Sequence, residues 1–167
     1  KEKIFTAEYA KASVMKTLLP ILDNAERAAG FEMGTEQYNK GIETIKFYLQ
    51  YTDTDNMFKD KDVLDIGCGA AGKSLYYLSL GAKSVTGIDV VEKYEEEAYS
   101  LQNELGLTGF TFKVEDAANM SFSDCSFDTI IMNDAMEHVA EPEKVLDEVY
   151  RVLKPGGKLY VNFPPYN

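Results

Sequence analysis

A glycine-rich segment constrains this chain more than any other stretch of its sequence. Residues 63–74 read V-L-D-I-G-C-G-A-A-G-K-S, an apolar run followed at once by a turn. Gly67, Gly69 and Gly72 have G-x-G-x-x-G spacing. Between a strand and a helix, this spacing lets the backbone approach a nucleotide-like ligand, and the first N–H groups of the helix face the same ligand. A tight strand-to-helix turn without a ligand gives the same pattern, so the rest of the sequence must decide.

Strand and helix patterns alternate from residue 63 onward. Short runs rich in apolar and β-branched residues predict strands, and segments with helical spacing predict the connections between them. We expect strands at 63–66, 84–88, 110–114, 127–132 and 158–163, and helices at 73–80, 92–105 and 142–153. Residues 154–157, K-P-G-G, predict a turn before the last strand. This alternation predicts an α/β fold with a parallel sheet and right-handed crossovers.

The chain before this α/β region lacks a good strand pattern. Apolar spacing predicts helices at 6–29 and 36–51, and the polar stretch 52–62 is interpreted as a linker. We therefore expect an N-terminal helical segment over residues 1–58, a candidate lid, followed by a core over residues 59–167.

Composition excludes several classes of protein and partner. The net charge of −11 disfavours a protein that tracks a nucleic-acid backbone, because such proteins need a basic surface. No apolar stretch has the length of a membrane span, and the N-terminus has no secretory signal pattern. The two cysteines lack the spacing of metal ligands, so no metal site is expected. These features together favour a reducing, cytoplasmic compartment.

Three carboxylates lie within or just after predicted strands, at positions where they could contact a ligand. Asp89 lies 22 positions after Gly67, where an acid can accept hydrogen bonds from both ribose hydroxyls, although it could also be an exposed carboxylate. Asp116 could accept from an adenine amine while the Ala117 N–H bonds a ring nitrogen, although turns favour Asp as well. Asp65 suits a ligand with positive charge near the loop, such as an ammonium group.

Five segments in this order resemble the class I S-adenosylmethionine-dependent methyltransferases, in particular the small-molecule group that includes quinone-biosynthesis methyltransferases. They are V-L-D-I-G-C-G, V-T-G-I-D, V-E-D-A, F-D-T-I-I-M-N-D-A-M-E-H-V and E-V-Y-R-V-L-K-P-G-G-K-L-Y-V, and the resemblance covers residues 63–167. It implies a Rossmann-like doubly wound parallel sheet of order 3-2-1-4-5, extended in the family by two more strands. Those last two strands are absent from this sequence, so we expect a chain truncated after the fifth strand.

The resemblance also implies a cofactor site, with S-adenosyl-L-methionine as the cofactor and S-adenosyl-L-homocysteine as the product. The residues that it assigns to the methionine part are Asp65, Gly67, Cys68 and Gly69. For the ribose and adenine they are Asp89, Val90, Asp116 and Ala117, and Asn133 would face the cofactor through its backbone.

The implied reaction is in-line displacement of the methyl group by an oxygen, nitrogen or carbon nucleophile of a small molecule. Proximity and orientation would supply most of the effect, and a base is needed only if the acceptor must lose a proton. His138, the single histidine, is the candidate base, and Glu137 is a candidate substrate contact. The alternative, which we favour, is that E-H-V shapes the loop after the fourth strand.

Two other classes of function share part of this pattern. A nicotinamide-dependent oxidoreductase would have the glycine loop and Asp89, but its loop commonly has an apolar residue at the position of Asp65. A non-catalytic cofactor-binding domain is the other alternative. No residue pattern identifies the methyl acceptor or the oligomeric state.

Overall fold

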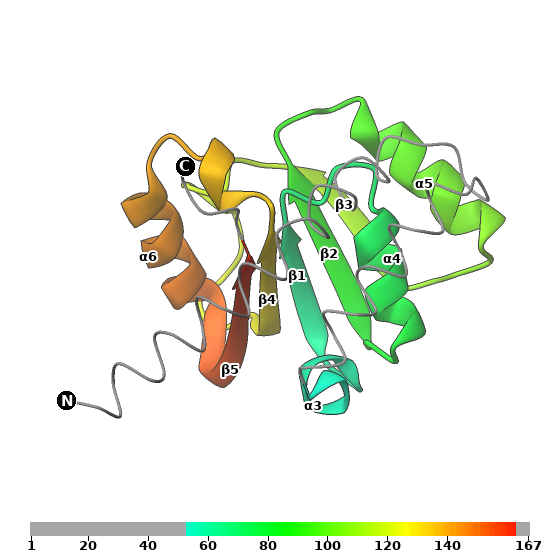
Figure 1. Cartoon of the computed structure of the whole chain (residues 1–167), viewed down its shortest axis with the longest axis horizontal. Coiled ribbons are helices and arrows are strands. Elements are labelled where there is room, and N and C mark those ends of the chain that lie inside the picture. Colours follow the sequence, from blue (N-terminus) through cyan, green and yellow to red (C-terminus); the bar gives the residue numbers. More distant parts are fainter. Residues whose placement is uncertain (1–52, 163–167) are drawn as a thin grey trace, which may run out of the picture. The chain divides into compact units, whose positions relative to one another are not determined.

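The structure, a computed structural model, describes residues 53–162, which form a parallel five-stranded sheet of order β3-β2-β1-β4-β5 (Figure 1). The predicted order 3-2-1-4-5 is therefore confirmed. The helices predicted at 6–29 and 36–51, with their candidate role as a lid, lie outside the described residues. The strands are β1 (Asp62–Ile66), β2 (Ser84–Asp89), β3 (Phe110–Val114), β4 (Phe127–Asn133) and β5 (Leu153–Asn162).

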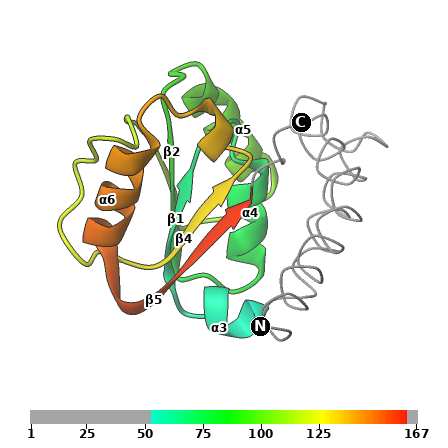
Figure 2. The same ribbon diagram turned by 60° about the vertical axis from the view of Figure 1, so that its left-hand side comes forward.

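Helices cover both faces of the sheet, which makes it doubly wound (Figure 2). Helices α4 (Gly72–Ser79) and α5 (Tyr94–Glu104) lie on one face, and α6 (Pro142–Val152) lies on the other. Pro142 occupies the first turn of α6, where backbone N–H groups have no partner within the helix, so its missing N–H costs no hydrogen bond. Among residues 53–162, no helix combines the length and the apolar character needed to cross a bilayer.

Strand β1 shows how the sheet divides the core between these two layers. Alternate side chains of a strand point to opposite faces. Leu64 and Ile66 pack in the cluster that includes Val145 and Val149 of α6, whereas Asp65 is hydrogen-bonded to Ser74 of α4. Both faces of β1 are thus buried, as expected for a central strand of a parallel sheet.

The register aligns the carboxyl ends of β1, β2 and β4 with one another. Ile66 pairs with Ile88 on β2 and with Met132 on β4. The residues that directly follow these partners are Gly67, Asp89 and Asn133. A ligand crevice is expected at these carboxyl ends, because the direction of the strand order reverses between β1 and β4.

The predicted linker at 52–62 is wrong in one respect, because it contains helix α3 (Thr54–Phe58). The side chain of Asp53 caps this helix by accepting a hydrogen bond from the Asn56 N–H at 3.1 Å. Phe58 is fully buried and stacks on Tyr77 with ring centroids 4.9 Å apart. The polar composition concealed this helix because only its last two residues, Met57 and Phe58, are buried.

Strand β5 begins five residues earlier than predicted. Leu153 pairs with Phe127, and Lys158 then pairs with Thr129, so residues 154–157 bulge out opposite Asp128. Gly156 has φ +78°, a left-handed conformation that favours glycine. The predicted turn is therefore a bulge inside the strand, because pairing resumes on both sides of it.

Candidate functional site

A cavity of about 470 Å³ opens at the carboxyl edge of the sheet, a volume typical of small-molecule sites. Its walls come from the ends of β1 and β2, the loop after β3 and the loop after β4. Six of the residues predicted from the sequence line it together: Gly67, Asp89, Val90, Asp116, Ala117 and His138. The other five, Asp65, Cys68, Gly69, Asn133 and Glu137, belong to the same loops and strand ends but are not part of the wall.

Only glycine suits position 67, at the start of the glycine loop, because a side chain would lack space and the backbone has a positive φ. Its φ is +73°, and a Cβ at this position would lie 2.8 Å from the Cβ of Ala135. The Gly67 N–H donates to the Ile88 carbonyl at 2.9 Å, which ties the loop to the end of β2. The loop after β4 therefore approaches β1 closely only because residue 67 has no side chain.

The carboxylate of Asp89 holds two backbone segments of the site in place. Its Oδ2 accepts a hydrogen bond from the Gly69 N–H, and its Oδ1 accepts one from the Val91 N–H, both at 3.0 Å. A carboxylate has about four acceptor positions, so capacity for two more donors remains. Asp89 thus orders the glycine loop and can also accept from two hydroxyl groups.

The loop after β3 supplies a second acid and an apolar contact. The Oδ1 of Asp116 accepts a hydrogen bond from the Ala118 N–H at 2.9 Å, the local turn contact that Asp commonly makes. Ala117, next to it, lines the cavity. Across the cavity wall, Val90 leaves 68% of its surface exposed, so it offers an apolar face to a flat ring.

Asp65 lies behind the cavity wall. It is only 3% exposed, and its Oδ2 accepts a hydrogen bond from the Ser74 hydroxyl at 2.6 Å. Burial raises the pKa of Asp65 to about 6, and the Ser74 hydrogen bond and the nearby Lys73 charge oppose that rise. Strand alternation explains the position, because Asp65 faces α4 while its neighbours face α6.

Cys68 is also buried behind the wall. Burial raises the pKa of its thiol, which disfavours the thiolate and therefore a nucleophilic role. A Cβ placed on Gly87 of β2 would lie 2.7 Å from the Cys68 Sγ, so this sulfur fills the space that Gly87 leaves. Cys68 thus acts as a small filler between the loop and β2.

The end of β4 contributes an acid that sequence reasoning missed. Asp134 lines the cavity, has φ +55°, and its Oδ2 accepts from the Lys73 Nζ at 3.0 Å. Both side chains of this ion pair are largely buried. Asn133, for which a backbone contact was predicted, accepts a hydrogen bond from the Asn162 amide at 3.0 Å through its side chain. The available signal was the acid that directly follows the fourth strand in M-N-D-A.

The segment E-H-V forms a short 3-10 helix, Met136–His138, beside the cavity. His138 is exposed and lines the cavity, so it can reach a ligand there. Glu137 does not line it, and its Oε2 is buried without a hydrogen-bond partner among the residues that the structure describes. The segment thus shapes the loop after β4 and also places one titratable side chain at the cavity.

No metal centre is present in the described part of the chain: residues 53–162 contain no group of three or more His, Cys, Asp or Glu placed to hold an ion. The acidic residues near α3 have other partners. Asp53 caps the helix, and Asp62 accepts from the amino groups of Lys83 and Lys154.

Similar proteins agree on the kind of domain. A curated relative, phosphoethanolamine N-methyltransferase 1 of Arabidopsis thaliana, is 29% identical over 123 residues, which are 73% of this chain and 24% of that protein. Sterol 24-C-methyltransferase erg-4 of Neurospora crassa is 37% identical over 100 residues, 59% of this chain and 26% of that protein. The chain thus spans about a quarter of the length of these two relatives.

Solved structures give the same result. The PH0226 protein from Pyrococcus horikoshii OT3 superposes with a TM-score of 0.68 at 32% identity, over 79% of this chain and 60% of that one. A SAM-dependent methyltransferase from Methanosarcina mazei gives a TM-score of 0.59 at 40% identity, over 64% of this chain and 54% of that one. The family model described as "Methyltransferase domain" matches residues 64–161, from β1 through the cavity residues to β5. More than half of the sequence is covered by this match, and the chain therefore belongs to the methyltransferase domain family.

Proposed function

We propose that this chain binds S-adenosylmethionine and transfers its methyl group to a small-molecule acceptor, leaving S-adenosylhomocysteine. One observation carries the proposal: the cavity brings the acceptor atoms of Asp89 and Asp116 together with the apolar face of Val90 and the bare backbone of Gly67. A nucleoside needs this set, because it presents hydroxyl and amine donors at its edges and an apolar ring face.

The residues at the cavity fit the nucleoside part of the cofactor. Asp89 would accept from the ribose hydroxyls with its remaining capacity. Asp116 and the Ala117 N–H would bond the adenine edge, and Val90 would pack against the ring. At Gly67 a Cβ would lie 2.8 Å from that of Ala135, so glycine here lets the loop after β4 close against the end of β1, where both line the cavity.

The remaining predicted residues would act at the methionine end. Gly69 and Cys68 continue the loop, and Asn133 is proposed to face the ligand through its backbone. Asp65 would act from behind the wall, since its buried carboxylate attracts a positive group across the loop without contacting the cavity.

When bound, the sulfonium cofactor supplies a methyl group already activated by positive charge. The chain would then bind the two reactants, align them and exclude water, so proximity and orientation supply most of the acceleration. His138 is proposed to hold the proton released by acceptors that must lose one, and Glu137 is proposed to support the loop around it.

The acceptor is proposed as a class only. Similar proteins carry names for N-, C- and O-methylation of phosphoethanolamine, a sterol and tocopherol. This range supports a small molecule, and the net charge of −11 disfavours a nucleic acid. The cysteines Cys68 and Cys125 are free thiols, which fits the proposed cytoplasmic location.

Calorimetry with S-adenosylmethionine, S-adenosylhomocysteine and NAD tests the cofactor. We expect both sulfur ligands to bind and NAD not to bind. Asp89→Ala should weaken binding by about 1.5–3 kcal/mol, because a charged hydrogen-bond partner is lost. The matched control, Asp128→Ala, removes a carboxylate at the opposite end of the sheet and should leave the affinity unchanged. Binding of NAD alone, or of none of the three ligands, would overturn the proposal.

Methyl transfer is tested separately, with isotopically labelled S-adenosylmethionine and a panel containing phosphoethanolamine, a sterol and a tocopherol precursor. Transfer of label to any of them supports the reaction and identifies the acceptor atom. Cofactor binding without transfer to any member of the panel would favour the non-catalytic alternative.

A further inference from the structure

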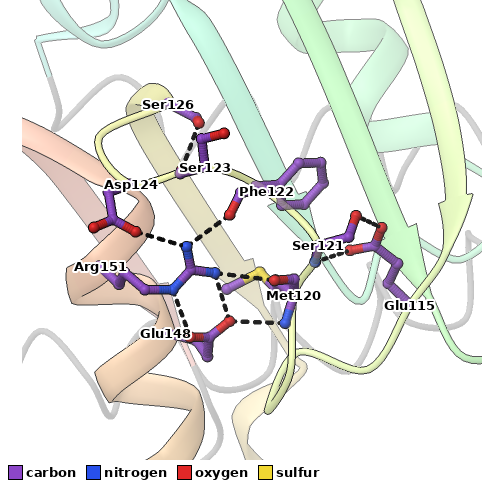
Figure 3. Close-up of polar contacts among 9 residues, drawn as sticks. All are labelled: Glu115, Met120, Ser121, Phe122, Ser123, Asp124, Ser126, Glu148 and Arg151. Carbon is purple, nitrogen blue, oxygen red and sulfur yellow. Dashed lines mark hydrogen bonds and ion pairs between the residues drawn. The ribbon is translucent and has the colours of Figure 1, made fainter.

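Helix α6 contributes no residue to the wall of the described cavity, yet it holds the loop that does. This loop joins β3 to β4 and runs from Glu115 to Ser126. Two side chains one turn apart on α6, Glu148 and Arg151, make its main polar contacts with the helix (Figure 3).

The guanidinium of Arg151 is fixed by Glu148 and faces the loop backbone. Its Nε and one terminal nitrogen donate to the two carboxylate oxygens of Glu148 at 2.7 and 2.8 Å, a bidentate arrangement. The terminal nitrogens also donate to the carbonyls of Met120 and Phe122, at 3.0 and 2.6 Å. One further contact, to the exposed carboxylate of Asp124 at 3.0 Å, completes the set.

The same pair holds both backbone polar groups of Met120. The Met120 N–H donates to the Glu148 Oε2 at 2.8 Å, while its carbonyl accepts from Arg151. The Met120 side chain is 5% exposed and packs in the core cluster with Ile66 and Ile88. Met120 is therefore held at its side chain and at both polar groups of its backbone.

Hydrogen bonds from the two sequence neighbours of Met120, Asn119 and Ser121, lead back to residues at the cavity. The Asp116 carbonyl accepts from the Asn119 N–H at 3.0 Å, and its carboxylate accepts from the Ala118 N–H. Glu115, which lines the cavity, accepts from the Ser121 N–H at 3.1 Å. Residues 115–121 thus form one hydrogen-bonded turn, which contains both Met120 and Asp116.

We propose that Glu148 and Arg151 are positioning residues for the adenine end of the cofactor site. This inference rests on the proposed function. The pair sets the location of Asp116 and Ala117 through Met120, although neither side chain touches the cavity. Side chains that support a site fix its geometry. Replacing Glu148 or Arg151 should therefore reduce the binding free energy by more than it reduces the free energy of unfolding.

Because Glu148 and Arg151 are partly exposed, their effect on ligand binding can be measured apart from their effect on folding. The side chains of Arg151 and Glu148 are 30% and 19% exposed, and an ion pair that reaches solvent contributes little to folding. A variant of Arg151 should therefore remain folded at low temperature. Its ligand affinity can then be measured on the native state.

The test compares Arg151→Met with Lys154→Met, a matched replacement of an ion-paired cation at the other end of the sheet. Calorimetry with S-adenosylhomocysteine and with adenosine is run at a temperature where circular dichroism shows both variants fully folded. We expect Arg151→Met to weaken both ligands by about tenfold, as for a typical coupling between sites. Lys154→Met should bind as the native chain does, and Arg151→Lys should recover part of the loss because it keeps the charge without the bidentate geometry.

Native affinity for S-adenosylhomocysteine in a folded Arg151→Met variant would overturn the inference. A loss for S-adenosylhomocysteine without a loss for adenosine would also overturn it, because the defect would then lie at the methionine end. If Arg151→Met does not fold, Glu148→Gln provides the same comparison with a smaller change. Failure of the native chain to bind S-adenosylhomocysteine would instead contradict the proposed function, and it is detected before any variant is made.

Discussion

Two pairs of carboxylates, one pair at each end of the sheet, have different hydrogen-bond partners. At the amino end, Asp62 and Asp128 share the Lys154 amino group at 3.4 and 2.8 Å, and Asp62 also pairs with Lys83. At the carboxyl end, Asp89 and Asp116 accept from backbone N–H groups and keep further acceptor positions. At the amino end the carboxylates are neutralised by lysine amino groups. At the carboxyl end the two carboxylates can still accept hydrogen bonds from a ligand in the cavity.

The pKa values follow the same division. Burial raises the pKa of Asp128, but hydrogen bonds from the Lys154 amino group and the Asp62 N–H outweigh it, so the net change is a lowering. In Asp65, at the cavity end, burial dominates and the pKa rises to about 6. Ionised Asp128 therefore stabilises the fold, whereas ionised Asp65 costs stability, as ionisable groups at functional sites commonly do.

The largest effect that would sharpen this comparison is expected at the amino end. Phe58→Ala should lower the free energy of unfolding by about 3–5 kcal/mol, because a fully buried aromatic ring is removed from the core. S-adenosylhomocysteine affinity should be unchanged at low temperature, since α3 does not line the cavity. Urea unfolding and calorimetry measure the two quantities, and a loss of affinity in the folded variant would contradict the division.

The next effect is a pH dependence specific to the cavity end. The folded-state pKa of Asp65, about 6, is above the ordinary value of 3.8, so its favourable contribution is full below about pH 4. That contribution is lost as the pH rises through 6. Asp65→Asn should therefore gain stability relative to the native chain by about 2–3 kcal/mol between pH 4 and pH 7, because one pKa unit corresponds to about 1.4 kcal/mol.

Urea unfolding of both proteins across this pH range measures the difference. Acids such as Asp128, whose pKa is lowered, act in both proteins and cancel in the comparison. A difference that stays constant with pH would show that Asp65 is not a strained acid.

A smaller effect is expected at Gly67, where a substitution should reduce both stability and ligand affinity. Gly67→Ala forces a side chain into φ +73° and places a Cβ 2.8 Å from that of Ala135. We expect a loss of about 1–3 kcal/mol in stability, together with weaker binding of S-adenosylhomocysteine. Gly156→Ala is the control, because its φ is also positive, at +78°, but no atom lies within 4 Å of a Cβ there and the residue does not line the cavity. Equal effects of the two variants on affinity would show that the contact with Ala135 does not shape the site.

The smallest effect is expected for the ion cluster of the amino end. Lys154→Met should change the free energy of unfolding by less than about 1 kcal/mol, because the charges are partly exposed and solvent screens them. Thermal unfolding at low and high salt should show the difference shrinking as salt is added. A large, salt-independent loss would mean that this cluster behaves as a buried one.

Sequence patterns predicted most of the fold because the strands are short apolar runs between clear turns. The strand order came from the family resemblance and was confirmed by the structure. Helix α3 was missed because its capping residue and polar side chains resemble a linker. The bulge at 154–157 was interpreted as a turn, because a local pattern cannot show that pairing with β4 resumes beyond it.

The site was predictable where chemistry follows strand ends, as for Asp89 and Asp116. The position of Asp65 behind the wall depends on which face of β1 each residue occupies, and the motif alone does not give this. Asp134 was missed because its importance comes from Lys73, which lies 61 positions away in the sequence. Ion pairs between distant segments become visible only in the folded chain.

The contact between Cys68 and Gly87 has a consequence for how this domain can vary among relatives. The Sγ of Cys68 occupies the place where a side chain on residue 87 would start, and even its Cβ would lie 2.9 Å from such an atom. An alanine at position 87 therefore needs a smaller residue at position 68 and also a small shift of Phe110, whose Cε2 would lie 3.1 Å from the new Cβ. In relatives, a side chain at position 87 should therefore accompany a smaller residue at position 68, whereas glycine at position 87 leaves position 68 free to vary in size.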